Sequence, residues 1–217
     1  MTTSGNYVLR VTDAFAGPLF EPLTFKVSES EIVGIVGVSG SGKTTLLEHI
    51  ARAAHEGAAG VAFAAGNGAT ISYLPQNPRH LFAGQLTARV VARLIGAGAV
   101  DYEESFSRLL AALSIDAAEA RRRPIDAFSG GQTQRIAIAA TLGRGARLWL
   151  ADEPTASLDP TNRVRLAGVV RDERERSGLT AIIASHDARF LESVCDRVLQ
   201  IEECSATILM RHARQSG

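Results

Sequence analysis

The sequence lacks the features expected of a secreted or membrane-spanning protein. Its 217 residues include two cysteines, Cys195 and Cys204, whose spacing fits neither a zinc site nor a disulfide framework. The opening residues, MTTSGNYVLRV, do not follow the basic-then-apolar pattern of a signal peptide. No run of about eighteen apolar residues is free of charges and glycines, so no segment is predicted to cross a bilayer. We therefore expect a protein of the reducing cytosol.

The chain also has no net charge at pH 7, with histidine counted as neutral. Lysine plus arginine total 23 and aspartate plus glutamate total 23, so the chain as a whole has no electrostatic attraction for nucleic acid. We expect no nucleic-acid partner. The composition is 46% hydrophobic, and a chain of this length can bury a sizeable core. Since there is no internal repeat or low-complexity segment, the sequence predicts a single domain over residues 1–217.

β-rich and helical segments alternate along most of the chain. Short runs of β-branched and apolar residues are typical of strands, and apolar residues three or four positions apart indicate helices. This alternation predicts an α/β fold with a mostly parallel sheet. The predicted strands cover residues 7–11, 23–27, 31–37, 147–152, 180–187 and 197–201, and the predicted helices cover residues 44–54, 102–115 and 162–176.

Two segments depart from that alternation. Residues 61–74, VAFAAGNGATISYL, contain two β-rich runs around Asn67-Gly68, a dipeptide that is typical of tight hairpin turns. This segment predicts a β-hairpin. Residues from about 81 to 142 have helical periodicity without strands, which predicts an inserted helical subdomain.

The segment GVSGSGKT, from Gly37 to Thr44, fits the phosphate-binding pattern G-x-x-x-x-G-K-[ST]. A predicted apolar strand enters it and a predicted helix leaves it, as the mechanism requires. The glycines allow backbone N–H groups to surround phosphate oxygens, Lys43 supplies positive charge, and the Thr44 hydroxyl can bind Mg²⁺. The residues predicted to bind a nucleotide here are Gly37, Ser39, Gly40, Ser41, Gly42, Lys43, Thr44 and Thr45.

Two adjacent carboxylates follow the apolar run of RLWLADEP. Asp152 and Glu153 are expected at the carboxyl end of a buried strand, where α/β sheets bind their ligands. Side chains at consecutive positions point to different sides, so the two carboxylates can have different roles. We predict that Asp152 holds Mg²⁺ through water and that Glu153 is the general base for an attacking water.

A second candidate anion site is the segment FSGGQTQR, residues 128–135. Ser129 can cap a helix that begins here, and the glycines leave backbone N–H groups accessible. A helix N-terminus of this kind attracts anions through its dipole and its free N–H groups. The sequence therefore predicts two anion sites in one chain.

These motifs together resemble the ATP-binding subunits of ABC transporters. GVSGSGKTT, FSGGQ, LADEP, SLD and SHD occur in that family's order and cover nearly the whole chain. FSGGQ resembles the ABC signature, with phenylalanine where leucine is commoner. The resemblance implies a P-loop NTPase core with a mostly parallel sheet, an N-terminal antiparallel β subdomain and an inserted α-helical subdomain. The stretch QNPRHLF is similar to the corresponding stretch in the ATPases of energy-coupling-factor transporters and of peptide and nickel importers.

The resemblance also implies roles for individual residues. Gln76 matches a glutamine that contacts Mg²⁺ or the lytic water, Asp159 matches the D-loop aspartate, and His186 matches a histidine that contacts the γ-phosphate. Phe15 matches the aromatic residue that stacks on adenine, with Phe20 as a competitor. The implied catalytic residues are Lys43, Gln76, Glu153 and His186; the implied metal ligands are Thr44, Gln76 and Asp152; and the implied signature residues are Ser129, Gly130, Gly131 and Gln132.

In this family the signature of one subunit closes over ATP held by the P-loop of another. The resemblance therefore implies ATP and Mg²⁺ as cofactors and a second ABC ATPase subunit as partner, in a homodimer or a heterodimer. It further implies integral membrane transporter subunits, an extracytoplasmic or membrane substrate-binding protein, and a position on the inner face of the cell membrane. The expected function is ATP-driven transport, as import, of a small solute.

Other P-loop classes remain as alternatives. One is a soluble ABC ATPase that is not coupled to transport, but only 84 residues, without sustained heptads, separate Lys43 from Phe128. That is too short for the coiled coils of chromosome and repair ATPases. Another alternative, a P-loop kinase, has no use for FSGGQ. The short tail after His186 leads us to expect no C-terminal regulatory domain.

Overall fold

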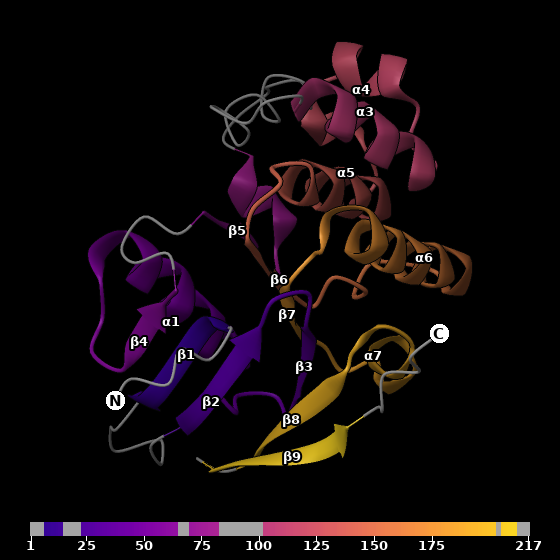
Figure 1. Ribbon diagram of the computed structural model, residues 1–217. Helices are drawn as coiled ribbons and strands as arrows, with labels where there is room; N and C mark the ends of the chain where they lie inside the picture. The colour runs from indigo at the N-terminus through magenta and orange to yellow at the C-terminus, as the bar shows by residue number, and fades with distance from the viewer. Residues whose placement is uncertain (1–6, 15–22, 65–69, 83–101, 203–204, 212–217) are drawn as a thin grey trace.

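The protein contains two β-sheets in a computed structural model that describes residues 7–14, 23–64, 70–82, 102–202 and 205–211 (Figure 1). Within these residues the larger sheet has the strand order β5-β6-β7-β3-β8-β9, and the smaller has the order β2-β1-β4. All neighbours in the larger sheet are parallel except β8 and β9. The smaller sheet is antiparallel. The predicted α/β fold is confirmed.

The strands are β1 (Tyr7–Ala14), β2 (Leu23–Ser28), β3 (Ile32–Val36), β4 (Val61–Phe63), β5 (Ile71–Leu74), β6 (Leu148–Asp152), β7 (Ala181–Ala184), β8 (Arg197–Glu202) and β9 (Ser205–Arg211). The helices are α1 (Lys43–Glu56), α3 (Tyr102–Ala112), α4 (Ala117–Arg122), α5 (Gly130–Leu142), α6 (Pro160–Ser177) and α7 (Ala188–Val194), with short 3₁₀ turns η1 (Pro78–Leu81) and η2 (Ile125–Ala127). No helix within these described ranges is both long enough and apolar enough to span a bilayer.

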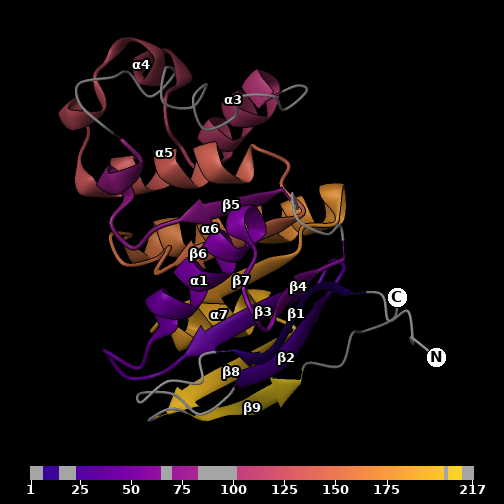
Figure 2. The ribbon, with the colours of Figure 1, turned by 90° about the vertical axis from the view of Figure 1, so that its left-hand side faces the viewer.

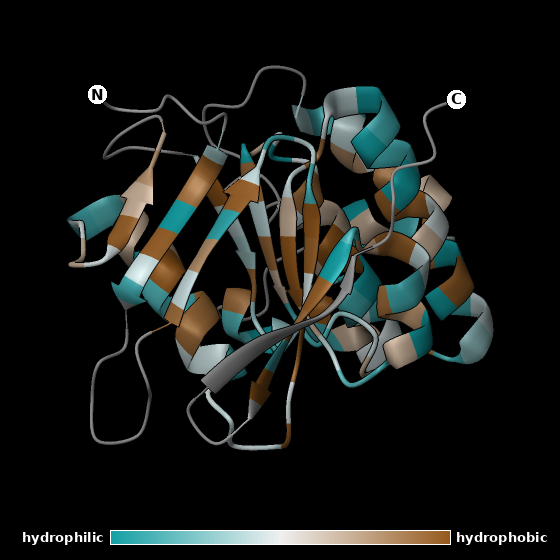
Figure 3. Ribbon diagram, turned by 60° about the horizontal axis from the view of Figure 1, so that its bottom comes forward, coloured by the Kyte–Doolittle hydropathy of each residue, from teal (hydrophilic) through white to brown (hydrophobic). Residues whose placement is uncertain are grey.

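The central strands are apolar because both faces of the larger sheet are covered. Every residue of β6 and β7 is buried, which is typical of parallel strands between two layers. Side chains of β6 alternate between two buried clusters: Trp149 and Ala151 lie in one, and Leu148 and Leu150 lie in the other. Figure 3 shows this concentration of hydrophobic residues in the strands, with polar residues on the outer surfaces of the helices.

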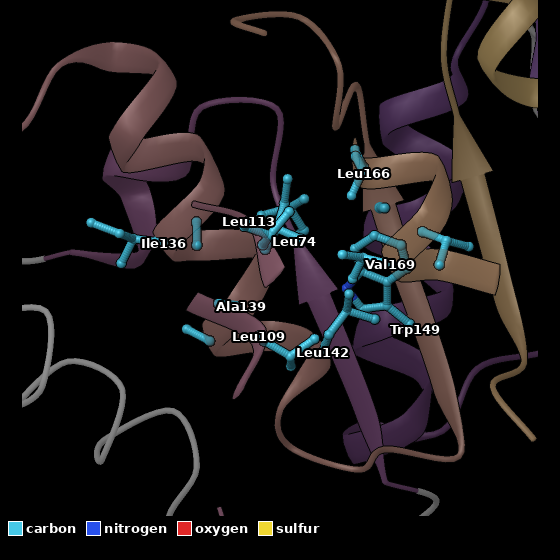
Figure 4. Close-up of a cluster of buried hydrophobic side chains, with 14 of the residues drawn as sticks. Leu74, Leu109, Leu113, Ile136, Ala139, Leu142, Trp149, Leu166 and Val169 are labelled. Carbon is cyan, nitrogen blue, oxygen red and sulfur yellow. The ribbon is translucent and has the colours of Figure 1, made fainter. Parts of the chain in front are cut away.

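The helices α3, α4 and α5 stack at one end of the molecule, beside β5, in two perpendicular views (Figures 1 and 2). Their apolar side chains continue the core of the sheet. Leu109 of α3 and Ile136 of α5 belong to the same buried cluster as Trp149 of β6 (Figure 4). The guanidinium of Arg108 also pairs with the buried carboxylate of Glu173 on α6, at 2.5 Å. The start of the predicted helical subdomain near residue 81 stays a prediction, because residues 83–101 lie outside the description.

The predicted hairpin over residues 61–74 is wrong. β4 pairs with β1 in the smaller sheet, whereas β5 pairs with β6 at the edge of the larger sheet. The segment therefore links two sheets and does not fold back on itself. Asn67 and Gly68 lie outside the described residues. The parallel register of β5 on β6 buries Ile71 and Leu74, and this tertiary contact determines the pairing.

The parallel strands bring the loops that follow them to one edge of the larger sheet. Gly37 follows β3, Gln76 lies shortly after β5, Glu153 follows β6 and Ser185 follows β7. Ligands of open α/β sheets bind at this carboxyl edge. The fold thus gathers four of the sequence motifs, although they are distributed over about 150 residues of the chain.

Candidate functional site

The loop between β3 and α1 has the conformation that phosphate binding requires. Gly40 and Gly42 have φ values of 82° and 91°, which residues with a Cβ rarely adopt. A Cβ at Gly37 would lie 2.4 Å from the carbonyl oxygen of Ile201 and 2.5 Å from Oγ of Ser41, so only glycine fits there. The sequence pattern therefore corresponds to a backbone curve that larger residues would disrupt.

Lys43, the first residue of α1, is a buried cation. Its Nζ donates hydrogen bonds to the carbonyl oxygens of Gly37, at 2.8 Å, and Val38, at 3.0 Å. Its side chain therefore lies along the inside of the loop instead of extending into solvent. This places a positive charge within the ring of backbone N–H groups that would surround phosphate oxygens.

Thr44 and Asp152 join the loop to the end of β6. The Thr44 hydroxyl donates a 2.6 Å hydrogen bond to Oδ2 of Asp152. Burial raises the pKa of the Asp152 carboxyl above its ordinary value, although the hydrogen bond from Thr44 lowers it. A hydroxyl and a carboxylate at one point suit Mg²⁺, which commonly takes few protein ligands and completes its shell with water and phosphate oxygens.

The Glu153 carboxylate faces a different set of partners from Asp152. Its Oε2 accepts hydrogen bonds from the Ser185 hydroxyl, at 3.3 Å, and from the backbone N–H of His186, at 3.2 Å. The Nε2 atom of His186 lies 3.4 Å from Oε1. Glu153 itself has φ = 48°, an uncommon backbone conformation for a residue with a side chain, and such residues cluster at functional sites.

These groups line one cleft of about 190 Å³ at the carboxyl edge of the sheet. The lining residues are Ser39, Gly40, Gly42, Lys43, Thr44, Thr45, Gln76, Asp152, Glu153 and His186. All four predicted catalytic residues and all three predicted metal ligands are among them. Gly37 and Ser41, also predicted to bind the nucleotide, do not line the cleft; Gly37 packs against Ser41 and Ile201 beneath the loop.

The signature segment begins α5 as the sequence predicts. Ser129 Oγ accepts from the N–H of Gln132 at 3.3 Å, and the Gln132 side chain accepts from the N–H of Ser129 at 2.9 Å, which completes a capping box. Ser129 and Gly130 are exposed. A Cβ at Gly131 would lie 2.9 Å from the carbonyl oxygen of Ser157, so the signature packs closely against the SLD loop.

The signature and the SLD loop do not face the cleft of their own chain. None of Ser129, Gly130, Gly131, Gln132 and Asp159 lines it, although all five are among the described residues. Asp159 instead caps α6 by accepting from the N–H of Asn162 at 2.9 Å. The two predicted anion sites are therefore separate in one chain. Phe15 and Phe20, the predicted adenine contacts, lie outside the described residues.

Phe128 has a clear structural role at the start of the signature. Its side chain is buried in the main cluster, and the Arg123 guanidinium lies over its ring, 5.0 Å from the centroid. The sequence offers no reason to prefer phenylalanine to leucine here. The contact supplies one, because an aromatic face attracts a cation and leucine has no such face.

Shortening Phe128 is expected to weaken the fold in proportion to the packing lost. Phe128→Ala should lower the free energy of unfolding by about 3–5 kcal/mol, since it removes a buried ring. Phe128→Leu should cost less than about 2 kcal/mol, because it fills most of the volume and loses only the cation–π contact. Urea denaturation followed by circular dichroism measures both values. Equal losses in the two variants would show that Phe128 does not act through packing.

The fold and the cleft define a P-loop nucleotide-binding domain. A comparison with protein families then gives the particular family: residues 20–156, more than half of the chain, match the family model described as ABC transporter. The chain belongs to the ABC transporter family, as the motifs predict, and is an ATP-binding domain of that family.

Similar proteins include several ATP-binding proteins of transport systems. The chain is 33% identical over 87% of its length to the lipoprotein-releasing system ATP-binding protein LolD of Anaeromyxobacter dehalogenans, covering 86% of that protein. It is 32% identical over 82% of its length to the phosphonates import ATP-binding protein PhnC of Rhizobium meliloti, covering 71% of it. It is 30% identical to a Brucella ovis ATP-binding protein provisionally assigned to peptide import, but it spans only 62% of that protein's length.

Solved structures agree on the fold. An ATP-binding subunit of an ABC transporter superposes with a TM-score of 0.76 at 24% identity, covering 93% of this chain and 90% of the other. The cbiO1 protein of Clostridium perfringens superposes with a TM-score of 0.74 at 21% identity, covering 94% of this chain and 88% of the other. At this level of identity the likeness concerns the fold alone.

Proposed function

We propose that this chain is the ATP-binding and ATP-hydrolysing subunit of an ABC transporter, and that it drives import of a small solute through separate membrane subunits. The observation that carries the proposal is the cleft in which Lys43, Thr44, Asp152, Glu153 and His186 converge. Relatives named for import of phosphonates and phosphite support the direction of transport. A substrate-binding protein outside the membrane and a position on its inner face belong to the same proposal.

The side chains of the cleft divide the chemistry among them. Lys43 and the loop N–H groups would bind the phosphates, and Thr44 and Asp152 would hold Mg²⁺, which when bound would neutralise charge on the phosphate oxygens. The Glu153 carboxylate accepts a proton from the attacking water. Gln76 and His186, in the loops that follow β5 and β7 on either side of β6, orient that water and contact the terminal phosphate. The roles of Gln76 and His186 are those that the resemblance to the family implies, and both residues line the cleft.

The partner we propose is a second ABC ATPase subunit, identical or related. Ser129 and Gly130 are exposed at a capped helix N-terminus that does not face the cleft of its own chain. An anion site of this kind can complete the cleft of another subunit, which gives two composite ATP sites in a symmetric or pseudo-symmetric dimer. ADP lacks the phosphate that the signature would contact, so hydrolysis would weaken the dimer.

The direct test is phosphate release by the purified chain with Mg-ATP, combined with purification from membranes. The proposal expects ATP hydrolysis and a polytopic membrane protein that co-purifies with the chain. Hydrolysis without any membrane partner would favour the alternative, a soluble ABC ATPase that is not coupled to transport. Absence of hydrolysis, both in the purified chain and in its complex, would contradict both functions.

Ser129→Arg is expected to block dimer closure without affecting nucleotide binding to the monomer. The larger cation breaks the capping box and occupies the exposed surface beside Gly130, but it lies outside the P-loop cleft. Titration with a fluorescent ATP analogue should give affinity within about two-fold of the unmodified chain, while ATPase activity falls at least about 10-fold. Ser193→Arg, at an exposed serine on α7, is the control and should retain activity.

A mixing experiment tests the composite site directly. Ser129→Arg retains an intact P-loop, and Lys43→Ala retains an intact signature, so a mixed dimer would contain one complete site. Under the homodimer form of the proposal, mixing the two inactive variants restores part of the activity. If the mixture stays inactive while each variant still dimerises with the unmodified chain, the composite-site arrangement is wrong.

A further inference from the structure

Two buried hydroxyl groups lie behind the Glu153 carboxylate. Thr155 is 2% exposed and Ser185 is 0% exposed. Their oxygens are 3.1 Å apart, and Ser185 Oγ is 3.3 Å from Glu153 Oε2. Neither hydroxyl lines the cleft, so neither is placed to touch a nucleotide. They connect the loop after β6 with the loop after β7, which contain Glu153 and His186.

The direction of these hydrogen bonds follows from the donors available. A serine hydroxyl has one hydrogen and two lone pairs, whereas an ionised carboxylate can only accept. Ser185 Oγ accepts from the N–H of Asp187 at 3.1 Å and must donate to Glu153. Thr155 must then donate to Ser185. The groups form a series in which Thr155 orients Ser185, and Ser185 orients the carboxylate.

The two carboxylate oxygens of Glu153 differ in their hydrogen bonds. Oε2 accepts from the Ser185 hydroxyl and from the N–H of His186. Oε1 is buried and has no hydrogen-bond partner among the described residues; Nε2 of His186 lies 3.4 Å from it. A buried carboxylate oxygen without a donor is costly unless a ligand or water completes it.

The backbone of Glu153 is held in place, but its side chain needs further contacts to fix the carboxylate. Its φ of 48° is uncommon for a residue with a side chain, and its N–H donates to the carbonyl oxygen of Ala184 at 2.8 Å. The backbone is thus held by β7, but the side chain has further torsions to fix. Hydrogen bonds from groups that are themselves buried restrict those torsions at little entropic cost, which is how sites keep a reactive group in one geometry.

We propose that Thr155 and Ser185 are positioning residues for the reaction, and that they anchor Oε2 of Glu153 so that Oε1 is the oxygen presented to the attacking water. The inference rests on the proposed ATPase function. It assigns a role to Thr155, which lies between LADEP and SLD, and to Ser185, the first residue of SHD, although neither lines the cleft. It also specifies which oxygen of the carboxylate takes the proton.

The test compares kcat and KM for ATP in variants that remove one hydroxyl at a time. Ser185→Ala and Thr155→Val should lower kcat by roughly 10- to 100-fold, with KM within about two-fold, because the carboxylate loses its orientation and the phosphate contacts do not change. Thr155→Ser keeps the hydroxyl and should retain kcat within about three-fold. A purely structural role would instead make Thr155→Ser and Thr155→Val differ only in stability.

Ser72→Ala is the matched control for burial. Ser72 is 1% exposed and its hydroxyl donates to the carbonyl oxygen of Thr141 at 2.7 Å, within β5 and outside the cleft. It should lower the thermal unfolding midpoint about as much as Ser185→Ala, but leave kcat unchanged. If Ser72→Ala and Ser185→Ala reduce kcat equally, the positioning role is overturned.

The double variant Ser185→Ala, Thr155→Val tests the serial order. Since Thr155 acts only through Ser185, the double variant should be no slower than Ser185→Ala alone; multiplied losses would overturn the series. If Ser185→Ala does not fold, the Thr155→Val and Thr155→Ser pair decides. Should the unmodified chain itself not hydrolyse ATP, alone or with its partners, the proposed function fails, whereas normal kcat in the variants overturns only the positioning role.

Discussion

Replacing Glu153 by glutamine is expected to lower kcat for ATP hydrolysis by about 100- to 10,000-fold, the usual contribution of a general base. Glutamine has the same shape and can place its carbonyl oxygen where Oε2 now accepts from Ser185 and His186. The amide nitrogen then occupies the place of Oε1 and cannot accept a proton from water. Folding and ATP binding should therefore be retained while the chemical step is lost.

In the proposed dimer this variant should also accumulate a closed state. ATP that is bound and not hydrolysed keeps its terminal phosphate between the P-loop and the signature, so size-exclusion chromatography with Mg-ATP should detect a dimer that ADP does not support. Glu173→Gln is the matched control, because Glu173 is equally buried, 6% against 7% exposed, but pairs with Arg108 away from the cleft. Unchanged hydrolysis by Glu153→Gln would refute the assignment of the base.

The residues at the carboxyl edge of the larger sheet could be predicted because each of them belongs to a short continuous motif in the sequence. GVSGSGKT needs only a preceding apolar strand and a following helix, and both are found as β3 and α1. The predicted strands over residues 147–152 and 180–187 follow from apolar runs that stop at polar residues, and β6 and β7 are found there. Parallel strands then bring the residues to one edge without further information.

The connection between β4 and β5 could not be predicted in the same way. A hairpin and a link between two sheets have the same local pattern, two β-rich runs around a turn dipeptide. The choice depends on partners far along the chain: β4 pairs with Leu9 and Val11 of β1, and β5 pairs with β6, about 75 residues later. The sequence analysis also did not predict the strand β9. This strand pairs with β8 and adds an antiparallel edge to the larger sheet.

The support around the site was also beyond the sequence. Thr155 follows LADEP and Ser185 is the first residue of SHD, but the resemblance implied a role for neither hydroxyl. Their role depends on a hydrogen bond between residues 30 positions apart, in two loops that meet only in the folded chain. Phe128 is a similar case, because the Arg123 side chain that covers its ring belongs to the residue just after α4, and no motif assigns that contact. Motifs therefore predict the groups that touch a ligand better than those that orient them.

Lys43→Ala is expected to weaken ATP binding by at least about 100-fold and to abolish measurable hydrolysis. The ammonium group has no acidic hydrogen-bond partner among the described residues; it donates to two carbonyl oxygens of its own loop, Gly37 and Val38. Phosphate oxygens are stronger acceptors because they are charged, and each charge-assisted hydrogen bond is worth roughly 1.5–3 kcal/mol. Two such bonds correspond to a loss of about two orders of magnitude or more.

Lys26 provides the control for this substitution, because the chain has only two lysines, Lys26 and Lys43. Lys26 is exposed on β2, whereas Lys43 is 6% exposed. Lys26→Ala removes the same charge and should leave binding of a fluorescent ATP analogue within about two-fold, since an exposed charge outside the cleft is screened by salt. Lys43→Arg separates the effect of charge from that of size. It keeps the cation, but a guanidinium is larger than the ammonium that lies 2.8–3.0 Å from the carbonyl oxygens of Gly37 and Val38, so this variant should also bind poorly. Equal affinity in Lys43→Ala and the unmodified chain would mean that the loop does not bind a triphosphate, and the proposed function would fail with it.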